Sequence, residues 1–400
     1  MKWRMLFILS VASLMGMSLW FSATAVTTSL SREWMLSESG QAWLTMSVQI
    51  GFVVGTITSA WFNLSDIFNA RRVFAVCAWA GAFCNTAIAW WADGLAIAVF
   101  FRFLTGVFLA GVYPPAMKVM ASWFKENRGL AIGTLVGALA VGSASPHFLR
   151  FAGSPDWRIL MHIASASSFF AGLLCFFFVK DGPFQTAGAK FDPGVVFRAL
   201  RNRSLRLANL GYLGHMWELY AMWTWLPAFL ASSFALTAMK DSASWASLVA
   251  FGAIATGLAG SIVAGWLADQ YGRTTVTIVS MLISGFCCLI VGLLYGGSPT
   301  LLTVLSLFWG FAIVADSAQF SAAITELCEP EYVGTMLTLQ TCLGFILTVV
   351  SIRLIPFLVS VVGWSWAFFV LAAGPAFGVW AMKSLKSLPE ASRIGGEQKS

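Results

Sequence analysis

The chain has 400 residues, of which 58% are hydrophobic and 10% charged, and its formal net charge is +7. Because a soluble domain carries about 25% charged residues, this composition excludes an ordinary soluble protein. Long apolar runs recur along the whole chain, each close to the ~20 residues with which a helix crosses a ~30 Å hydrocarbon core. The sequence therefore predicts an all-α protein with many transmembrane spans.

Short polar or Gly/Pro segments divide the apolar sequence into twelve predicted transmembrane helices, numbered here as spans one to twelve. In chain order their approximate ranges are 5–27, 40–64, 73–92, 96–122, 129–150, 158–179, 207–232, 244–266, 275–295, 301–325, 334–358 and 364–383.

Span one also resembles a signal peptide, because Lys2 and Arg4 precede an apolar run that ends in Ala23-Thr24-Ala25. We expect this segment to be retained, since it is long enough to span a membrane. Its loss would also leave an odd number of helices and an incomplete internal repeat.

Lysine and arginine are distributed unequally over the predicted connections. Eighteen lie at the termini and after even-numbered spans, five lie near the connections after odd-numbered spans, and Arg102 lies within a span, which accounts for all 24. Basic residues gather on the cytoplasmic side of a membrane. This bias predicts cytoplasmic termini in a plasma membrane, which we expect to be a bacterial inner membrane.

The seven cysteines indicate neither a disulfide framework nor a metal site, because six lie within apolar runs and none has CxxC spacing. No segment resembles a nucleotide-binding loop, and neither HExxH nor GxSxG occurs. The sequence therefore predicts a protein that is not an enzyme and that has no metal, no cofactor and no nucleic-acid partner.

The two halves of the chain resemble each other at an offset of about 203–207 residues. LSDIFNARR (64–72) aligns with LADQYGRTT (267–275), and Trp157 aligns with Trp364. A repeat of this size is typical of transporters built from two bundles around a central site. We therefore expect two pseudo-symmetric six-helix bundles, at residues 1–180 and 207–385. A cytoplasmic linker (181–206) joins them, and a cytoplasmic tail (386–400) follows the second.

GWLADQYGR (265–273) follows span eight on the predicted cytoplasmic side. It resembles the G-x-L-a-D-r-x-G-R loop of the major facilitator superfamily, and the span number agrees as well. In this resemblance Gly265 allows close helix packing and Gly272 a tight turn with positive φ. Asp269 and Arg273 would then form polar contacts of a cytoplasmic gate.

The first-half copy of this loop retains Asp66, Arg71 and Arg72 as gate residues, but Phe62 and Asn69 replace its two glycines. Asparagine tolerates the left-handed conformation, so the turn can persist. Close packing is less certain without the first glycine. We therefore expect the gate to rely more on the second copy.

Two further segments resemble elements of the same superfamily. RFLTG (102–106) resembles its R-x-x-x-G element, and WFKENRGLAIG (123–133) resembles a join found in carboxylate, oxalate–formate, nitrate and organic-anion members. The second likeness implies an anionic substrate. GALAVGSASPHF (137–148) lacks the GPxxGG pattern of drug–proton antiporters, which makes multidrug efflux less favoured without excluding it.

Acidic residues near the inner end of span ten suggest a further gate contact. Glu326, Glu329 and Glu331 could pair with cytoplasmic arginines such as Arg128. This pairing is a hypothesis only.

A charged side chain at the bilayer centre costs at least ~2.5–3.5 kcal/mol, so each one needs a partner, water or a function. Glu218 lies roughly 16 Å deep in span seven, and His215 precedes it by one turn on the same face. Burial disfavours a charged carboxylate, and histidine titrates near neutral pH. We expect this pair to carry a coupling proton or, alternatively, to fix span seven to a neighbour.

Three other polar residues are candidates for the substrate or coupling site. Asp316 and Gln319 share a polar stretch of span ten that suggests a water-lined wall, and Arg102 lies nearer the outer side of span four. Arg102 stays charged, so it could attract an anion or stabilise a carboxylate. Asp316 could instead form a buried pair or an interdomain hydrogen bond, and Arg102 could form a structural bridge within the first half.

Tyr113-Pro114-Pro115 predicts a kink or local opening of span four, because proline removes helix hydrogen bonds. Tyr113 and Pro114 could line a cavity there. Trp217 and Trp223 could line the pocket beside Glu218 or simply pack against neighbours.

Five polar residues lie near the outer ends of predicted spans, where snorkelling is cheap. We expect structural roles for them; they are His147, Arg150, Arg158, His162 and Arg353.

These features predict a secondary transporter, expected to be monomeric, that moves a small solute across the membrane by alternating access. An organic anion is the favoured solute and a proton the favoured coupling ion. Two alternatives remain open: an efflux antiporter for drugs or metabolites, and a sensor or scaffold that retains this fold without transport. The residues alone do not choose the substrate or the direction of transport.

Overall fold

The structure is a computed structural model. It describes residues 1–62, 64–124, 128–153, 156–184, 194, 201–237, 239–329 and 332–395, without the side chains of Glu38, Ser65, Asp66 and Arg128. Most of the predicted linker and the end of the predicted tail therefore lie outside the described residues.

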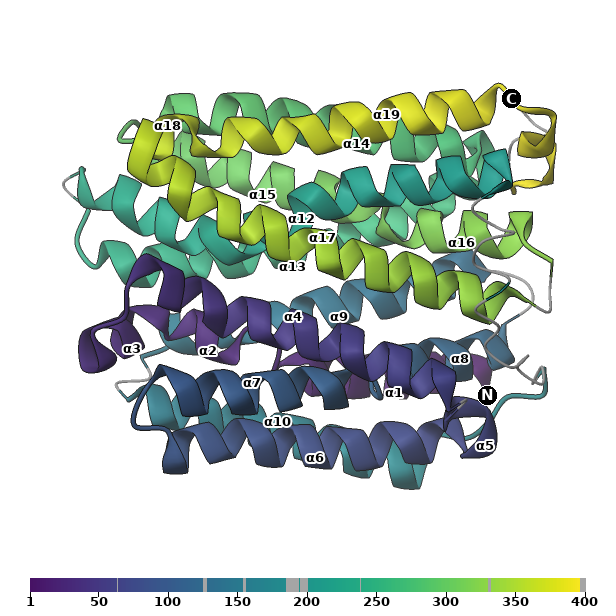
Figure 1. Ribbon diagram of the computed structural model, residues 1–400, viewed down its shortest axis with the longest axis horizontal. Helices are drawn as coiled ribbons and strands as arrows, with labels where there is room; N and C mark the ends of the chain where they lie inside the picture. Colours follow the sequence, from purple (N-terminus) through teal and green to yellow (C-terminus); the bar gives the residue numbers. More distant parts are fainter. Residues whose placement is uncertain are drawn as a thin grey trace. The chain divides into compact units, whose positions relative to one another are not determined.

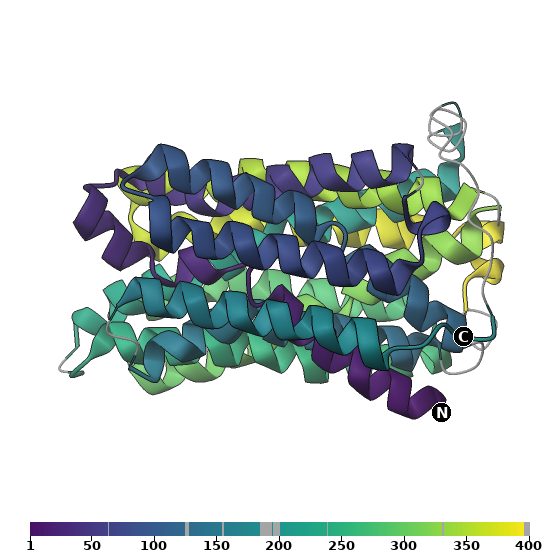
Figure 2. The ribbon, with the colours of Figure 1, turned by 90° about the horizontal axis from the view of Figure 1, so that it is seen from below.

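The contacts within the chain group it into two compact units. Unit 1 comprises Met1–Ala187 and Met239–Phe251, and unit 2 comprises Gly188–Ala238 and Gly252–Ser400. All regular structure of the described residues is helical, and within each unit the helices lie along a common direction in both views (Figure 1, Figure 2).

The described helices of unit 1 range from single turns to full membrane spans. They are α1 (Lys2–Met17), α2 (Ser22–Ala25), α3 (Thr27–Trp34), α4 (Glu38–Trp61), α5 (Leu64–Ile67), α6 (Ala70–Trp91), α7 (Leu95–Leu109), α8 (Tyr113–Trp123), α9 (Arg128–Phe151) and α10 (Trp157–Phe178).

Unit 2 has a similar set of long helices together with short 3-10 segments, and the first residues of its helix α13 are grouped with unit 1. In chain order they are α12 (Arg203–Ala235), α13 (Ser242–Tyr271), α14 (Arg273–Ile290), η1 (Val291–Leu294), α15 (Pro299–Ala315), α16 (Ser317–Leu327), α17 (Val333–Val362), α18 (Trp364–Ala367), η3 (Phe368–Ala372), α19 (Ala373–Lys386) and η4 (Pro389–Arg393).

Ten helical stretches of the described chain are long and apolar enough to cross a membrane. The two predicted spans outside this set are one and seven. Span one is divided into short helices, and α12 is long, but its apolar sequence is interrupted by Asn209, His215 and Glu218. Both exceptions therefore arise from polar or irregular features inside otherwise apolar segments.

Three spans predicted as single segments are interrupted. Span one breaks between α1 and α2, span four between α7 and α8, and span ten at Asp316. In span four the cause is local: Pro114 and Pro115 cannot donate to the preceding turn, and they fit the first turn of α8 instead. The predicted kink at Tyr113-Pro114-Pro115 is therefore confirmed.

Spans four and ten are built alike. Helices α7 and α15 begin 204 residues apart, and so do α8 and α16, which have 11 residues each. A Cβ atom on Gly106 would collide with the carbonyl oxygen of Val48, and one on Gly310 with that of Ala253. The same close helix crossing, which requires glycine, is thus present in both units.

Candidate functional site

The carboxylate of Glu218 is buried within unit 2, with the side chain on α12. Its Oε1 atom accepts hydrogen bonds from the indole of Trp309 (2.5 Å) and the thiol of Cys288 (3.2 Å), and Oε2 accepts one from Ser284 (2.9 Å). Donors from α14 and α15 therefore surround it. Because hydrogen bonds of this kind favour the charged form while burial disfavours it, this arrangement holds a carboxylate where an isolated charge would be costly.

His215 contacts a different carboxylate. Its Nδ1 atom lies 2.9 Å from Oδ1 of Asp316, and its Nε2 atom lies 3.0 Å from the hydroxyl of Ser317. Both His215 and Asp316 are buried. The contact has ion-pair distance without hydrogen-bond geometry, since Oδ1 of Asp316 has no hydrogen-bond partner among the described residues.

Asp316 lies at the interruption of span ten, where it ends α15 and immediately precedes α16. The imidazole of His215 on α12 therefore contacts the carboxylate of Asp316 at the point where the helix of span ten is interrupted. His215 and Glu218, which share one helix face, contact two different groups of residues.

Gln319 and Arg273 form a third group. The Nη1 atom of Arg273 donates to Oε1 of Gln319 (2.8 Å), and its Nε and Nη2 atoms donate to the carboxylate of Glu326. Gln319 is therefore a partner of the loop arginine, one turn of α16 beyond Asp316. Glu326, one of the three acidic residues near the end of span ten, pairs with Arg273 within unit 2. The side chain of Arg128 is not described, so its pairing with these acids stays a prediction.

The loop 265–273 has the local features that its sequence implies. Gly272 has a φ of +89°, a conformation that favours glycine, and precedes α14. Asp269 is exposed and lies 3.6 Å from Nη2 of Arg273, and Gly265 is buried in α13. The second-half loop therefore combines a glycine turn with a largely buried arginine.

The first-half loop is held differently. Asn69 does not adopt the left-handed conformation, which corrects our expectation: its φ is −59°, and its side-chain oxygen caps α6 by accepting from the amide of Arg71. Asn69 also donates to Asp181, and Arg71 donates to the carbonyl of Val179. A side-chain cap thus replaces the glycine turn. Arg72 is exposed, and the side chain of Asp66 in α5 is not described.

Arg102 is completely buried in unit 1 and donates mainly to backbone carbonyls. Its partners are Leu44 (3.1 Å), Leu19 (2.8 Å), Trp20 and the hydroxyl of Ser22 (3.2 Å). Leu19 and Trp20 lie in the break between α1 and α2. The guanidinium therefore donates to carbonyl groups in the break of span one and on α4, an arrangement that favours the structural alternative.

The predicted cavity residues are less closely grouped. Tyr113 and Pro114 are half-buried at the start of α8. The indole of Trp217 donates to the carbonyl of Val370 in η3, and Trp223 is buried against Tyr220, with their ring centroids 5.3 Å apart. Both tryptophans thus have packing contacts, and a cavity lined by these residues stays a prediction.

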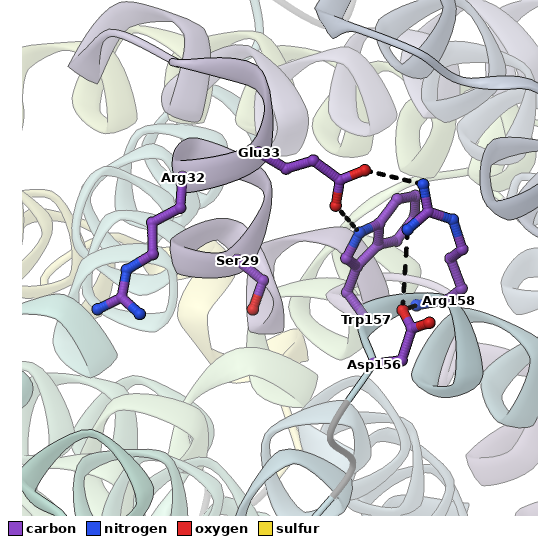
Figure 3. A pocket seen from close by; sticks show the side chains of 6 residues that line it. All are labelled: Ser29, Arg32, Glu33, Asp156, Trp157 and Arg158. Carbon is purple, nitrogen blue, oxygen red and sulfur yellow. Dashed lines mark hydrogen bonds and ion pairs between the residues drawn. The ribbon is translucent and has the colours of Figure 1, made fainter.

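A pocket in unit 1 is lined by residues that belong to none of these groups (Figure 3). It is lined by Ser29, Arg32, Glu33, Asp156, Trp157 and Arg158. Glu33 of α3 accepts hydrogen bonds from the indole of Trp157 (2.6 Å) and from Arg158 (2.8 Å), both at the start of α10. These two donors lower the pKa of Glu33. Arg158 pairs with both Glu33 and Asp156, so these contacts link α3 to the start of α10.

A sequence profile described as the Major Facilitator Superfamily matches residues 6–262 and, in a second match, residues 208–399. The chain belongs to the major facilitator superfamily. It is therefore a multi-pass membrane transporter, and its helical architecture is consistent with the twelve-helix fold of this superfamily.

Individual relatives are distant. The chain is 23% identical to the niacin transporter NiaP of Acinetobacter baylyi over 71% of this chain and 70% of that protein. It is 26% identical to solute carrier family 22 member 6 of Rattus norvegicus, over 45% of this chain and 32% of that protein. The structure of the proton:xylose symporter XylE superposes with a TM-score of 0.73 at 12% identity, covering 96% of this chain and 95% of that chain. This last likeness concerns the fold.

In this superfamily member, sequence reasoning missed the residues that surround the predicted acids. Ser284, Cys288 and Trp309 bind Glu218, and Ser317 contacts His215. Ser284 and Cys288 are one helical turn apart, which places both on one face of α14. That spacing is common in apolar helices, so it became informative only once the packing of α14 against α12 was known.

Proposed function

We propose that the chain is a proton-coupled secondary transporter that moves a small organic anion by alternating access. The contact between His215 and Asp316 carries this proposal. It places an acid and a base 2.9 Å apart, both buried, at an interruption of a membrane helix. Irregular backbone at membrane depth occurs where it packs on protein or lines a cavity, and an ionisable residue there is a candidate for function.

The pair can take up and release a proton without loss of helical hydrogen bonds. With one proton shared between them, His215 and Asp316 have no net charge, and a second proton makes the pair a cation. Ser317 and Phe320, which contact the imidazole, are uncharged. The charge of this site therefore follows its proton content directly, which is the property that a coupling site needs.

Glu218 has a different role in this proposal. Its three donors come from three side chains on neighbouring helices, and each would lose its acceptor if the carboxylate were replaced. We assign Glu218 mainly to holding α12 against α14 and α15, with Asp316 as the proton-carrying acid. This choice revises the expectation that Glu218 and His215 act as one pair.

Two observations support an anionic solute. WFKENRGLAIG (123–133) resembles the corresponding segment of carboxylate and organic-anion members, and one of the relatives is a niacin transporter. Niacin is a small aromatic carboxylate. We therefore take nicotinate as the first probe, together with benzoate, salicylate and oxalate.

The proposal also covers the setting of the transporter. We place it as a monomer in a bacterial inner membrane, with both termini in the cytoplasm. The group formed by Arg273, Gln319 and Glu326 then belongs to the cytoplasmic gate, with the remaining gate residues Gly265, Asp269 and Gly272 beside it.

Uptake into proteoliposomes with an imposed pH gradient tests this function. We expect the wild type to accumulate at least one of the four acids when the gradient favours it. Asp316→Asn should abolish accumulation while solute exchange at equal pH continues. Asp93→Asn, at an exposed loop position, is the matched control and should behave as the wild type.

Three outcomes would contradict the proposal. Absence of flux for all four acids would favour the non-transporting alternative. A transport rate that does not depend on the pH gradient would show that transport is not coupled to protons. Full accumulation by Asp316→Asn would show that coupling lies elsewhere, with Glu218 as the next residue to test.

A further inference from the structure

His147 is a buried histidine whose ring nitrogens are both without a partner. It lies in α9, directly after Pro146, and its side chain is 1% exposed. Neither Nδ1 nor Nε2 has a hydrogen-bond partner among the described residues. Its one recorded ring neighbour is Phe21, at a centroid distance of 6.2 Å.

The other two histidines of the chain have partners. His162 on α10 lies 3.5 Å from the hydroxyl of Thr86, and His215 contacts Asp316. A buried polar group without a hydrogen bond is unfavourable, and such groups in native proteins require an explanation. A ligand that supplies the missing partner is one such explanation, and it is open to test.

The position of His147 is close to the break in span one. Arg150, one turn further along α9, donates to the carbonyl of Ala25 at the end of α2. Phe21, the ring neighbour of His147, lies in the break itself, beside the carbonyls that Arg102 holds. The outer part of α9 therefore packs on the irregular segment of span one and presents an unpartnered imidazole there.

The charge of the surrounding spans selects the kind of ligand. The six predicted spans of the first half contain no Asp or Glu, whereas Arg102 and Arg150 both lie at the break in span one. An environment with only positive ionised groups favours an anion over a cation. A carboxylate suits both features, because it is an anion and it can accept the hydrogen bond that the imidazole N–H donates.

We infer that His147 is a solute-binding residue that donates a hydrogen bond to the carboxylate of a small organic acid. This inference rests on the proposed function, because it names one contact of the proposed solute. It revises the structural role expected from the position of His147 near the end of span five. It also assigns recognition of the anion to unit 1 and proton exchange to unit 2.

His147→Leu separates a binding role from a structural one, because the two predict opposite changes in stability. Leucine removes the unpartnered nitrogens, so the solute-free variant should melt at the same temperature as the wild type or higher. Its affinity for the acid that the wild type binds most tightly among nicotinate, benzoate, salicylate and oxalate should fall about tenfold or more, the loss expected for a charge-assisted hydrogen bond. His147→Gln keeps a donor and should bind within a few-fold of the wild type.

The control is His162→Leu, which removes a histidine that already has a partner and should leave affinity unchanged. Nicotinamide, the uncharged amide of nicotinate, serves as a second comparison if nicotinate binds. In His147→Leu, the affinities for nicotinate and nicotinamide should differ less than they do in the wild type.

The outcomes distinguish this inference from the function on which it rests. If the wild type binds none of the four acids, the proposed function fails and the inference fails with it. If the wild type binds an acid and His147→Leu binds it equally well, only the inference is overturned. The same conclusion follows if His147→Leu melts at a lower temperature and the remaining folded protein keeps the wild-type affinity.

Discussion

Units 1 and 2 each bury a charged side chain where a membrane span is interrupted, and they surround it differently. In unit 1, the guanidinium of Arg102 donates to the carbonyls of Leu19 and Trp20 in the break of span one. In unit 2, Asp316 lies at the interruption of span ten beside the imidazole of His215. One charge is bonded to backbone, and the other to a group that can itself ionise.

This difference is the basis on which we assign a structural role to Arg102 and propose proton exchange at Asp316. Arg102 is completely buried, so without these carbonyls its charge would have few partners, and its bonding is part of the fold. In the proposed function Asp316 is instead the acid that exchanges a proton, with His215 beside it at ion-pair distance. A buried charge is therefore better judged by its partners than by its depth.

Replacement of Arg102 should have the largest effect on stability. Arg102→Met keeps much of the side-chain volume but leaves the carbonyls of Leu19, Trp20 and Leu44 without this donor. A hydrogen bond from a charged group contributes about 1.5–3 kcal/mol and all those of the guanidinium are lost, so we expect a loss of about 3 kcal/mol or more. Thermal unfolding in detergent measures it.

The control for this prediction is Arg72→Met, which changes an exposed arginine and should leave the melting temperature nearly unchanged. If Arg102→Met unfolds at the wild-type temperature but no longer binds the transported acid, the structural role assigned to Arg102 is wrong. Arg102 would then be a binding residue.

Arg273→Lys tests the polar group of the second-half loop and should have an intermediate effect. Arginine reaches Glu326 through Nε and Nη2 and Gln319 through Nη1, and a lysine ammonium cannot reproduce this fork. We expect a loss of about 1–3 kcal/mol from the weakened charge-assisted bonds. The melting temperature and the rate of solute exchange should fall together, because this group is assigned to the gate.

Arg72→Lys is the matched control for the first-half loop. An effect of equal size in the two variants would show that the glycine turn at 272 and the asparagine cap at 69 support equivalent gates.

Glu218→Gln sharpens the comparison within unit 2. The amide is nearly isosteric, but its NH2 group faces a donor where Glu218 presented an acceptor. We expect a loss of about 1–2 kcal/mol of stability, with proton-driven accumulation retained per folded molecule. Glu390→Gln, at an exposed position in η4, is the control. If Glu218→Gln is as stable as the wild type but has lost proton-driven accumulation, the roles assigned to Glu218 and Asp316 are reversed.

The sequence predicted the helical class and the break in span four, because composition, apolar run length and proline act locally. It did not predict the break in span one. That segment has no proline, and its stabilising group, Arg102, lies more than 80 residues away along the chain. Only the packing of α7 against the break connects the two.

The candidate site was predicted only in part, because local sequence patterns do not show which helices pack together. Two residues three apart on a helix share a face, which is why His215 and Glu218 were expected to act together. Their partners, however, come from α14, α15 and α16, and the order of residues within span seven contains no information on which helices it contacts. Gln319 likewise was grouped with Asp316 by proximity in sequence, whereas its bond to Arg273 comes from α14.

The smallest effect should come from Glu33, which links α3 to α10 in unit 1 (Figure 3). Its hydrogen bonds from Arg158 and Trp157 lower its pKa in the folded protein below the ordinary value of 4.5. A carboxyl whose folded pKa is lowered contributes stability above the unfolded pKa and loses that contribution as the pH falls through the folded value. As the pH falls from 5 to 3, the wild type should therefore lose a little stability, and Glu33→Gln should not show this loss.

The side chain is 41% exposed, so solvent screening keeps the difference below about 1 kcal/mol. Melting curves of both proteins over this pH range measure it, with Asp93→Asn as the control. Parallel curves for the wild type and Glu33→Gln would mean that this link contributes nothing to stability in this pH range.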